Sequence, residues 1–159
     1  MCADKRCEYM RAAVDLALSN ASSLGGGPFG AVIERGGEII SACNNTVTPD
    51  NDPTAHAEVN AIREACRKLG TFNLSGCTLY TSCEPCPMCL SAAYWARVDR
   101  IYYAAGREDA AKAGFSDAFI YDELTLPLKE RSIPIERIME QEGNEPFERW
   151  VENDKKIPY

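Results

Sequence analysis

The chain has 159 residues, of which 45% are hydrophobic and 26% charged, and this composition fits one globular domain with a sizeable core. A formal net charge of −7 argues against a polyanionic partner, since non-specific affinity for nucleic acid is built from clustered Lys and Arg. The first residues lack the apolar run of a signal peptide, and no apolar stretch approaches transmembrane length. We therefore expect a cytoplasmic protein without a membrane partner.

The eight cysteines are an even number, which in a short secreted chain would indicate a disulfide framework. In a reducing cytoplasm, clustered cysteines are more often metal ligands, and scattered ones are small buried apolar residues. We expect a reducing cytoplasm here, and therefore no disulfide framework. The cysteines are Cys2, Cys7, Cys43, Cys66, Cys77, Cys83, Cys86 and Cys89.

The N-terminal third of the chain predicts a helix followed by a hairpin. Apolar residues recur at helical spacing over residues 7–24, and three glycines follow. Residues 28–34 and 38–44 are typical of two strands, with a Gly-Gly turn between them. Residues 45–52 form a polar loop in this prediction.

Alternating helices and strands are predicted for the middle of the chain. Asp52 followed by a proline is a typical helix start, and that helix should end before Gly70. The order of elements favours helices packed on a largely parallel sheet. The predicted elements are helices over residues 52–69, 85–97 and 107–113, strands over 77–82 and 99–104, a last short strand over 133–138 that Pro134 would keep at an edge, and a tail over 144–159 with a short helix and an extended end.

Two motifs contain the candidate metal-binding and catalytic residues. Pro53-Thr54-Ala55-His56-Ala57-Glu58 contains His-x-Glu, and Thr81-Ser82-Cys83-Glu84-Pro85-Cys86-Pro87-Met88-Cys89 contains Pro-Cys-x-x-Cys, a combination typical of zinc deaminases that act on nucleobases. One imidazole and two thiolates make three zinc ligands, His56, Cys86 and Cys89, and leave the fourth tetrahedral position open for water. His56 is the only histidine in the chain, so any Ser-His-Asp or Cys-His mechanism would need this same residue.

A closed structural site is the alternative to this open one. Cys83 lies three residues before Cys86, so Cys83 could complete a Cys3His site. Glu84-Pro85 breaks the helical register between the two cysteines and favours the open site.

Glu58 is the predicted general base. Two thiolates cancel the charge of Zn²⁺, so the metal acidifies water less than in a three-histidine site, and a base becomes more necessary. Residues two apart on an ideal helix do not share a face. His56 and Glu58 must therefore converge in an irregular first turn or approach the water from different sides; the alternative for Glu58 is a solvated helix residue.

The sequence resembles the cytidine deaminase-like superfamily and, within it, the bacterial guanine deaminases. The matching segments cover residues 26–33, 51–58, 80–89, 94–97, 113–115 and 119–121. The resemblance implies an α/β fold, a three-layer α/β/α sandwich on a five-stranded mixed sheet, with residues 1–159 as a single zinc-dependent domain. It also implies one Zn²⁺ per chain and a homodimer in which the C-terminal segment, about residues 140–159, is exchanged between partners.

The resemblance also implies contacts to a small purine base. Asn45 would hydrogen-bond the purine, Phe29 would pack against its ring, the backbone N–H of Ala57 would meet it, and Trp95 belongs to a segment that favours a guanine enzyme. Asp117 would accept hydrogen bonds from guanine N–H groups, and Tyr159 would close the site. The simpler alternatives are a turn role for Asn45, core packing for Phe29 and Trp95, a loop cap for Asp117 and a disordered chain end for Tyr159.

The implied function is zinc-dependent hydrolytic deamination of guanine to xanthine and ammonia in purine salvage or catabolism. The alternatives are the same chemistry on guanosine, cytosine, cytidine or tRNA adenosine, and a non-catalytic zinc-stabilised binding module. Binding to tRNA is disfavoured because the C-terminal stretch is mainly acidic.

Overall fold

The computed structural model describes residues 4–23 and 25–159. The chain forms two compact units that divide after Asp117, and each unit is described by itself. In chain order the elements are α1 (Lys5–Ser23), β1 (Gly30–Arg35), β2 (Glu38–Asn44), α2 (Val47–Asp50), α3 (Ala57–Leu69), β3 (Cys77–Cys83), α4 (Pro87–Ala96), β4 (Arg100–Ala105), α5 (Arg107–Lys112), α6 (Ala118–Thr125), the 3₁₀ helix η1 (Leu128–Glu130) and α7 (Glu140–Glu152).

The first unit is built on a four-stranded mixed sheet in the order β2-β1-β3-β4. β1 is antiparallel to both β2 and β3, and only the β3–β4 pair is parallel. The expectation of a largely parallel sheet was therefore wrong, because the β1–β2 hairpin and the β1–β3 pair outweigh the single crossover. The predicted strand over residues 133–138 has no strand conformation, so the described residues contain four strands and not five. Pro134 interrupts this segment and lacks a backbone N–H for pairing.

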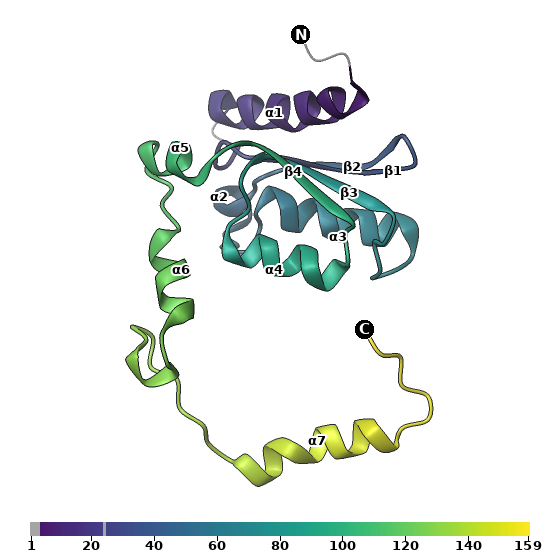
Figure 1. The fold of residues 1–159 in the computed structure, drawn as a ribbon, viewed down its shortest axis with the longest axis vertical. Coiled ribbons are helices and arrows are strands. Elements are labelled where there is room, and N and C mark those ends of the chain that lie inside the picture. Colours follow the sequence, from purple (N-terminus) through teal and green to yellow (C-terminus); the bar gives the residue numbers. More distant parts are fainter. Residues whose placement is uncertain (1–3, 24) are drawn as a thin grey trace. The chain divides into compact units, whose positions relative to one another are not determined.

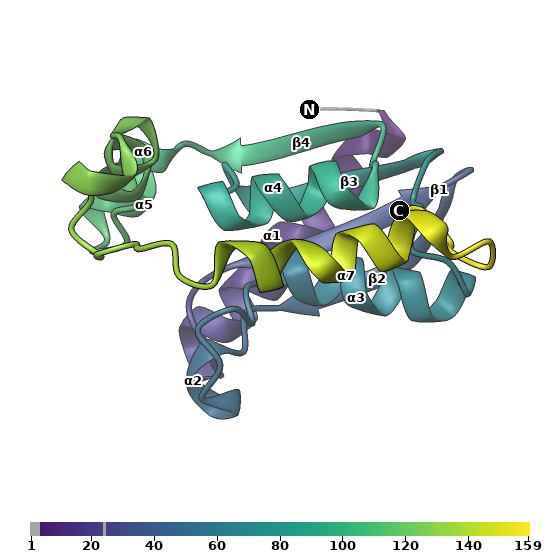
Figure 2. The ribbon, with the colours of Figure 1, turned by 90° about the horizontal axis from the view of Figure 1, so that it is seen from below.

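Helices cover both faces of the sheet and complete three layers. α1 lies over one face, and α3 and α4 run side by side over the other (Figure 1 and Figure 2). Alternate strand residues divide between the two faces: Val32 and Tyr80 pack with α1, whereas Ile33 and Leu79 belong to the core under α3 and α4. Gly30 allows α1 to approach closely, because an added Cβ would lie 2.3 Å from the Ala13 carbonyl oxygen.

The start of α3 differs from the prediction in a way that shapes the site. The helix begins at Ala57, and His56 is its N-cap with φ −68° and ψ 152°. Asp52 does not cap this helix, because its Oδ1 accepts hydrogen bonds from the Thr54 N–H and hydroxyl, both at 2.7 Å, and closes a turn. The helix ends as predicted at Gly70, which has φ 65°.

The start of α4 is also later than predicted. Cys86 is the N-cap, with φ −65° and ψ 168°, and Pro87 occupies the first helical position. One predicted metal ligand therefore occupies the extended N-cap position of each of these two helices. A further difference is the short helix α2 within the predicted polar loop.

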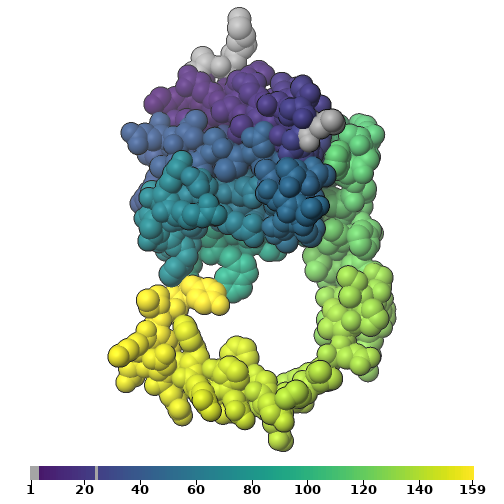
Figure 3. All heavy atoms as spheres, turned by 180° about the vertical axis from the view of Figure 1, so that it is seen from behind, coloured from purple at the N-terminus to yellow at the C-terminus, as the bar shows by residue number. Residues whose placement is uncertain are grey.

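The second unit has helices but no core of its own. None of residues 118–159, which Figure 3 draws in green to yellow, is buried. The predicted helix of the tail is confirmed and starts earlier, at Glu140. Large apolar side chains on this unit are exposed, among them Ile138 at 79% and Phe147 at 71%.

Most of the cysteines that the structure describes are free thiols. Cys43, Cys66, Cys77, Cys83, Cys86 and Cys89 are free thiols, whereas Cys7 is disulfide-bonded, which the expected reducing environment did not anticipate. Among the residues described, no helix combines the length and apolarity needed to cross a bilayer.

Candidate active site

Three predicted metal ligands meet where α3 and α4 begin. The Nδ1 atom of His56 lies 3.6 Å from Cys86 Sγ and 3.4 Å from Cys89 Sγ, and all three ligand atoms are within 4.8 Å of one another. Zinc–sulfur and zinc–nitrogen bonds of ordinary length, in tetrahedral geometry, would place N and S roughly 3.5 Å apart. The two N···S distances therefore fit a single tetrahedral zinc ion.

Protonation of the two thiols also fits a metal site. The hydrogen bond from Cys89 lowers the pKa of Cys86 to about 4. The same shared hydrogen bond, with burial, raises the pKa of Cys89, and a hydrogen bond to Cys86 raises the pKa of His56. A divalent cation bound here would hold both sulfurs as thiolates.

Glu58 lies beside this cluster and is buried, with 6% of its surface exposed. Its Oε1 accepts a hydrogen bond from Thr81 Oγ1 at 3.1 Å, and its Oε2 lies 3.5 Å from Cys89 Sγ. Burial raises the pKa of Glu58. Because His56 is the extended N-cap and Glu58 is the second helical residue, the two side chains converge without having to share a helix face. The solvated-glutamate alternative does not fit this burial.

Cys83 lies outside the cluster formed by His56, Cys86 and Cys89. It ends β3 and is 8% exposed, and its Sγ donates to the Gly106 carbonyl oxygen at 3.8 Å. Burial raises the pKa of this thiol, and the carboxylates of Glu58 and Asp117 raise it further. Its Sγ is not one of the three ligand atoms that lie within 4.8 Å of one another, so the geometry favours the open three-ligand site.

We expect Cys83→Ser to retain a full equivalent of zinc, because serine can donate to Gly106 and the three ligands are untouched. Metal content measured by plasma emission spectroscopy tests this, with Cys86→Ser as the matched variant that should lose the metal. Loss of zinc from Cys83→Ser would instead establish a closed four-ligand site.

Asn45 lies in the loop after β2, and Ala57 directly follows the candidate ligand His56. Asn45 is 4% exposed, and its Oδ1 accepts hydrogen bonds from the N–H groups of Gly27 at 3.1 Å and Val47 at 3.2 Å. These bonds hold the loop together, as the turn alternative requires, and they occupy the amide oxygen of Asn45. The Asn45 Nδ2 donor has no acceptor within residues 4–23 and 25–159. Ala57 is the first residue of α3, so its N–H has no partner within the helix.

Phe29 and Asp117 lie at the end of the sheet that carries the motifs. The rings of Phe29 and Phe115 meet edge to face, with centroids 5.1 Å apart and an interplanar angle of 85°. Both rings, together with Cys83, line an apolar pocket of 380 Å³. Asp117 is half-buried and acts on the same cysteine through its charge. Phe115 as the packing partner of Phe29 was not predicted from the sequence, since nothing in the local pattern pairs residues 86 positions apart.

Trp95 and Tyr159 are not brought to the cluster within the first unit. Trp95 is 68% exposed near the end of α4, roughly 13 Å along the helix axis from Cys86. Tyr159 belongs to the second unit and is 72% exposed. Their substrate contacts stay predictions.

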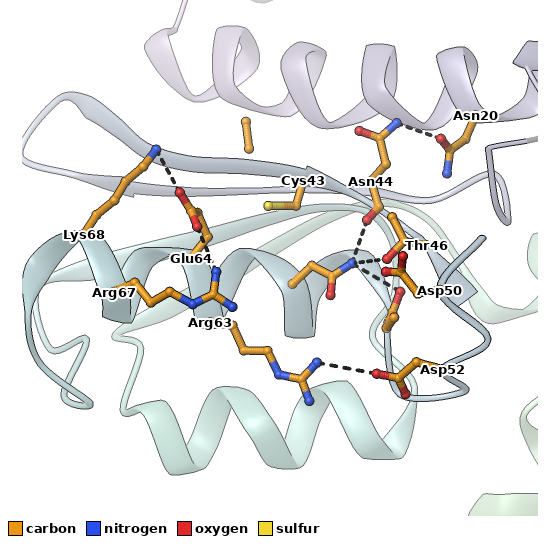
Figure 4. A pocket seen from close by; sticks show the side chains of 13 residues that line it. Asn20, Cys43, Asn44, Thr46, Asp50, Asp52, Arg63, Glu64, Arg67 and Lys68 are labelled. Carbon is orange, nitrogen blue, oxygen red and sulfur yellow. Dashed lines mark hydrogen bonds and ion pairs between the residues drawn. The ribbon is translucent and has the colours of Figure 1, made fainter. Parts of the chain in front are cut away.

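A second pocket lies elsewhere on the first unit. It has a volume of 730 Å³ between β2, the α2 region and α3, and its polar lining includes Asn44, Thr46 and Arg63 (Figure 4). Its charged groups pair locally: Arg63 with Asp52 at 3.9 Å, and Lys68 with Glu64 at 3.5 Å. None of the three candidate metal ligands lines it.

Comparison with known families decides the lineage of this site. Residues 3–105 match the family described as the cytidine and deoxycytidylate deaminase zinc-binding region. The chain belongs to this deaminase family. Membership accounts for the His-Cys-Cys cluster, because it falls within the matched zinc-binding region.

Relatives within the deaminase family cover most of the chain. The guanine deaminase of Bacillus subtilis (strain 168) is 54% identical over 142 residues, which are 89% of this chain and 91% of the relative. The X-ray structure of guanine deaminase from Bacillus subtilis superimposes with a TM-score of 0.93 at 51% identity, covering 96% of this chain and 97% of that one. The tRNA-specific adenosine deaminase of Aquifex aeolicus (strain VF5) is 47% identical over 100 residues, 62% of this chain and 65% of the relative. The predicted α/β cytidine deaminase-like fold is confirmed, apart from the strand count.

Proposed function

We propose that this chain catalyses the zinc-dependent hydrolytic deamination of guanine to xanthine and ammonia, a step of purine salvage or catabolism. The observation that carries the proposal is the convergence of His56, Cys86 and Cys89 beside the buried carboxylate of Glu58. The long match to a guanine deaminase, over 89% of the chain, selects the substrate.

The three ligands would hold one Zn²⁺ per chain, and this ion supplies Lewis-acid activation of a water molecule near neutral pH. Glu58 takes a proton from the attacking water and delivers it to the ring nitrogen next to the amino-bearing carbon. It then takes the proton of the hydroxyl group that has added to this carbon and transfers it to the amino group. The C=O bond forms as the C–N bond breaks, and ammonia leaves. The burial that raises the pKa of Glu58 suits a group that must both accept and return a proton.

The groups proposed to recognise the substrate come from several elements. The Asn45 Nδ2 and the Ala57 N–H are donors for purine acceptors, and Phe29 packs against the ring. Asp117 accepts hydrogen bonds from guanine N–H groups, which adenine could not satisfy in the same way. Trp95 and Tyr159 complete the proposed set and close the site.

Deamination of adenosine in tRNA is the second candidate, since a tRNA-specific adenosine deaminase is 47% identical over 100 residues. Phosphate binding would need clustered basic side chains. The C-terminal stretch offers Glu140, Glu142, Glu145, Glu148, Glu152 and Asp154 against Arg149, Lys155 and Lys156. This balance favours a free base over a polynucleotide.

The proposed state is a homodimer, with residues of the second unit exchanged between chains. Residues 118–159 bury none of their apolar side chains, and such a surface needs a partner. We expect sedimentation equilibrium to give twice the 17.5 kDa chain mass. Phe147→Glu should weaken the dimer, whereas Glu145→Gln should leave it intact. A monomeric wild-type protein would refute the exchange.

The proposed location is the cytoplasm, because a reducing compartment keeps the two cysteine ligands from being oxidised to a disulfide.

Ammonia release tests the function directly. The zinc-loaded protein is offered guanine, guanosine, cytosine, cytidine, adenine and a tRNA anticodon stem-loop under identical conditions. We expect a clear preference for guanine, with xanthine as the product. Activity on another substrate would overturn the substrate roles above, and zinc-loaded protein that deaminates none of them would be a binding module.

A further inference from the structure

β3 places one polar side chain in an otherwise apolar part of the core. Cys77, Leu79 and Thr81 alternate onto the face covered by α3 and α4, where Cys77 and Leu79 join the main hydrophobic core. Thr81 is only 1% exposed. A hydroxyl buried this deeply must find a hydrogen-bond partner, or its burial costs free energy.

The partner of this hydroxyl is the carboxylate of Glu58. Thr81 Oγ1 donates to Glu58 Oε1 at 3.1 Å, while Glu58 Oε2 lies 3.5 Å from Cys89 Sγ. As a metal ligand Cys89 is a thiolate and has no proton to donate. Among the residues described, the Thr81 hydroxyl is then the side-chain donor to this carboxylate when metal is bound.

The two carboxylate oxygens therefore have different surroundings. Oε1 points to the strand and is held by a neutral hydroxyl, and Oε2 points to the cluster of metal ligands. We propose that Thr81 is a positioning residue for the reaction: it anchors Oε1 of Glu58 so that Oε2 faces the reacting atoms.

Thr81 is itself held rigidly. Its backbone pairs with Ala31 on one side and with Tyr103 on the other, so it belongs to an interior strand. A β-branched side chain has few χ1 rotamers, which keeps the hydroxyl in one direction. The donor Thr81 is thus fixed on β3, whereas the base Glu58 lies on α3. The hydrogen bond between them fixes the position of the Glu58 carboxylate relative to both elements.

The inference rests on the proposed deaminase function, and Thr81→Val tests it because valine keeps the shape and removes only the hydroxyl. We expect kcat on guanine to fall by about 10- to 100-fold, which is a part of the about 10²- to 10⁴-fold that a positioned acid–base group contributes. KM, zinc content and the affinity for xanthine measured by calorimetry should stay within about twofold. Thr81→Ser keeps a donor and should recover most of the lost kcat. Single-turnover rates are measured as well, so that slow product release does not hide the chemical step.

Thr78→Val is the matched control, since Thr78 lies on the same strand and faces the opposite side of the sheet. It should leave kcat unchanged. Wild-type kcat in Thr81→Val overturns the positioning role while leaving the deaminase function intact. A loss that comes with zinc loss, or that Thr81→Ser does not recover, means a packing role and also overturns it. If valine prevents folding, Thr81→Ala replaces it under the same criteria. A wild-type protein that releases no ammonia refutes the proposed function and the inference with it.

Discussion

Glu58→Gln should keep a full equivalent of zinc and lose nearly all turnover. Glutamine has the same shape and its amide oxygen can still accept the Thr81 hydrogen bond, but it cannot carry a proton between water and substrate. Removing a general acid–base group costs about 10²- to 10⁴-fold in rate, and one group serving several proton transfers should lie at the upper end. Steady-state kinetics on guanine, with metal content and circular dichroism on the same preparation, measure the effect.

The control for this variant is Glu64→Gln on the same helix. Glu64 forms surface ion pairs with Arg67 at 3.1 Å and Lys68 at 3.5 Å, away from the cluster. Exposed pairs of this kind contribute little to stability, so kcat should match the wild type. A Glu58→Gln protein with wild-type zinc content and wild-type rate would exclude Glu58 as the base.

Cys86→Ala and His56→Ala should each lose the metal and all activity above background. Each change leaves two of three protein ligands, and zinc sites depend on the full donor set. The fold should persist, because neither side chain belongs to the main hydrophobic cores. Zinc added to the wild type should raise the melting temperature through binding to the folded state, and this response should vanish in both variants.

Cys43→Ala is the matched control for the cysteine variant. Cys43 is a free, half-buried thiol on β2 and is no part of the His56 cluster. The control should bind one equivalent of zinc and respond to added metal as the wild type does. A Cys86→Ala protein that retains a full equivalent would show that the metal is held elsewhere.

Local patterns were sufficient for most elements of the first unit. The hairpin is one example: the predicted strand over residues 38–44 has the bounds observed for β2, because a Gly-Gly turn fixes where it starts. The start of α3 was missed because Asp52 can cap a helix or close a turn. The local sequence around Asp52 is compatible with both roles. In the structure the Thr54 hydroxyl donates to Asp52 Oδ1 and stabilises the turn. α6 was missed because residues 118–125 carry no clear capping signal.

The metal ligands could be predicted because the spacing of His-x-Glu and Pro-Cys-x-x-Cys is typical of a zinc site. The residues that surround the ligands could not be predicted in this way. The Thr81–Glu58 hydrogen bond joins residues 23 positions apart, on a strand and a helix whose relative register appears only in the fold. In the second unit the sequence pattern was misleading about burial. Its apolar residues indicate burial, but the chain alone does not bury them.

The solitary imidazole of the chain makes the site its own spectroscopic probe. With one histidine in 159 residues, a long-range ¹H–¹⁵N spectrum contains a single imidazole spin system and needs no assignment. The sulfurs lie against Nδ1, so a bound metal at this nitrogen leaves the proton on Nε2 and fixes one tautomer. Metal loading, loss to a chelator and exchange between ions can thus be followed atom by atom in the unmodified protein.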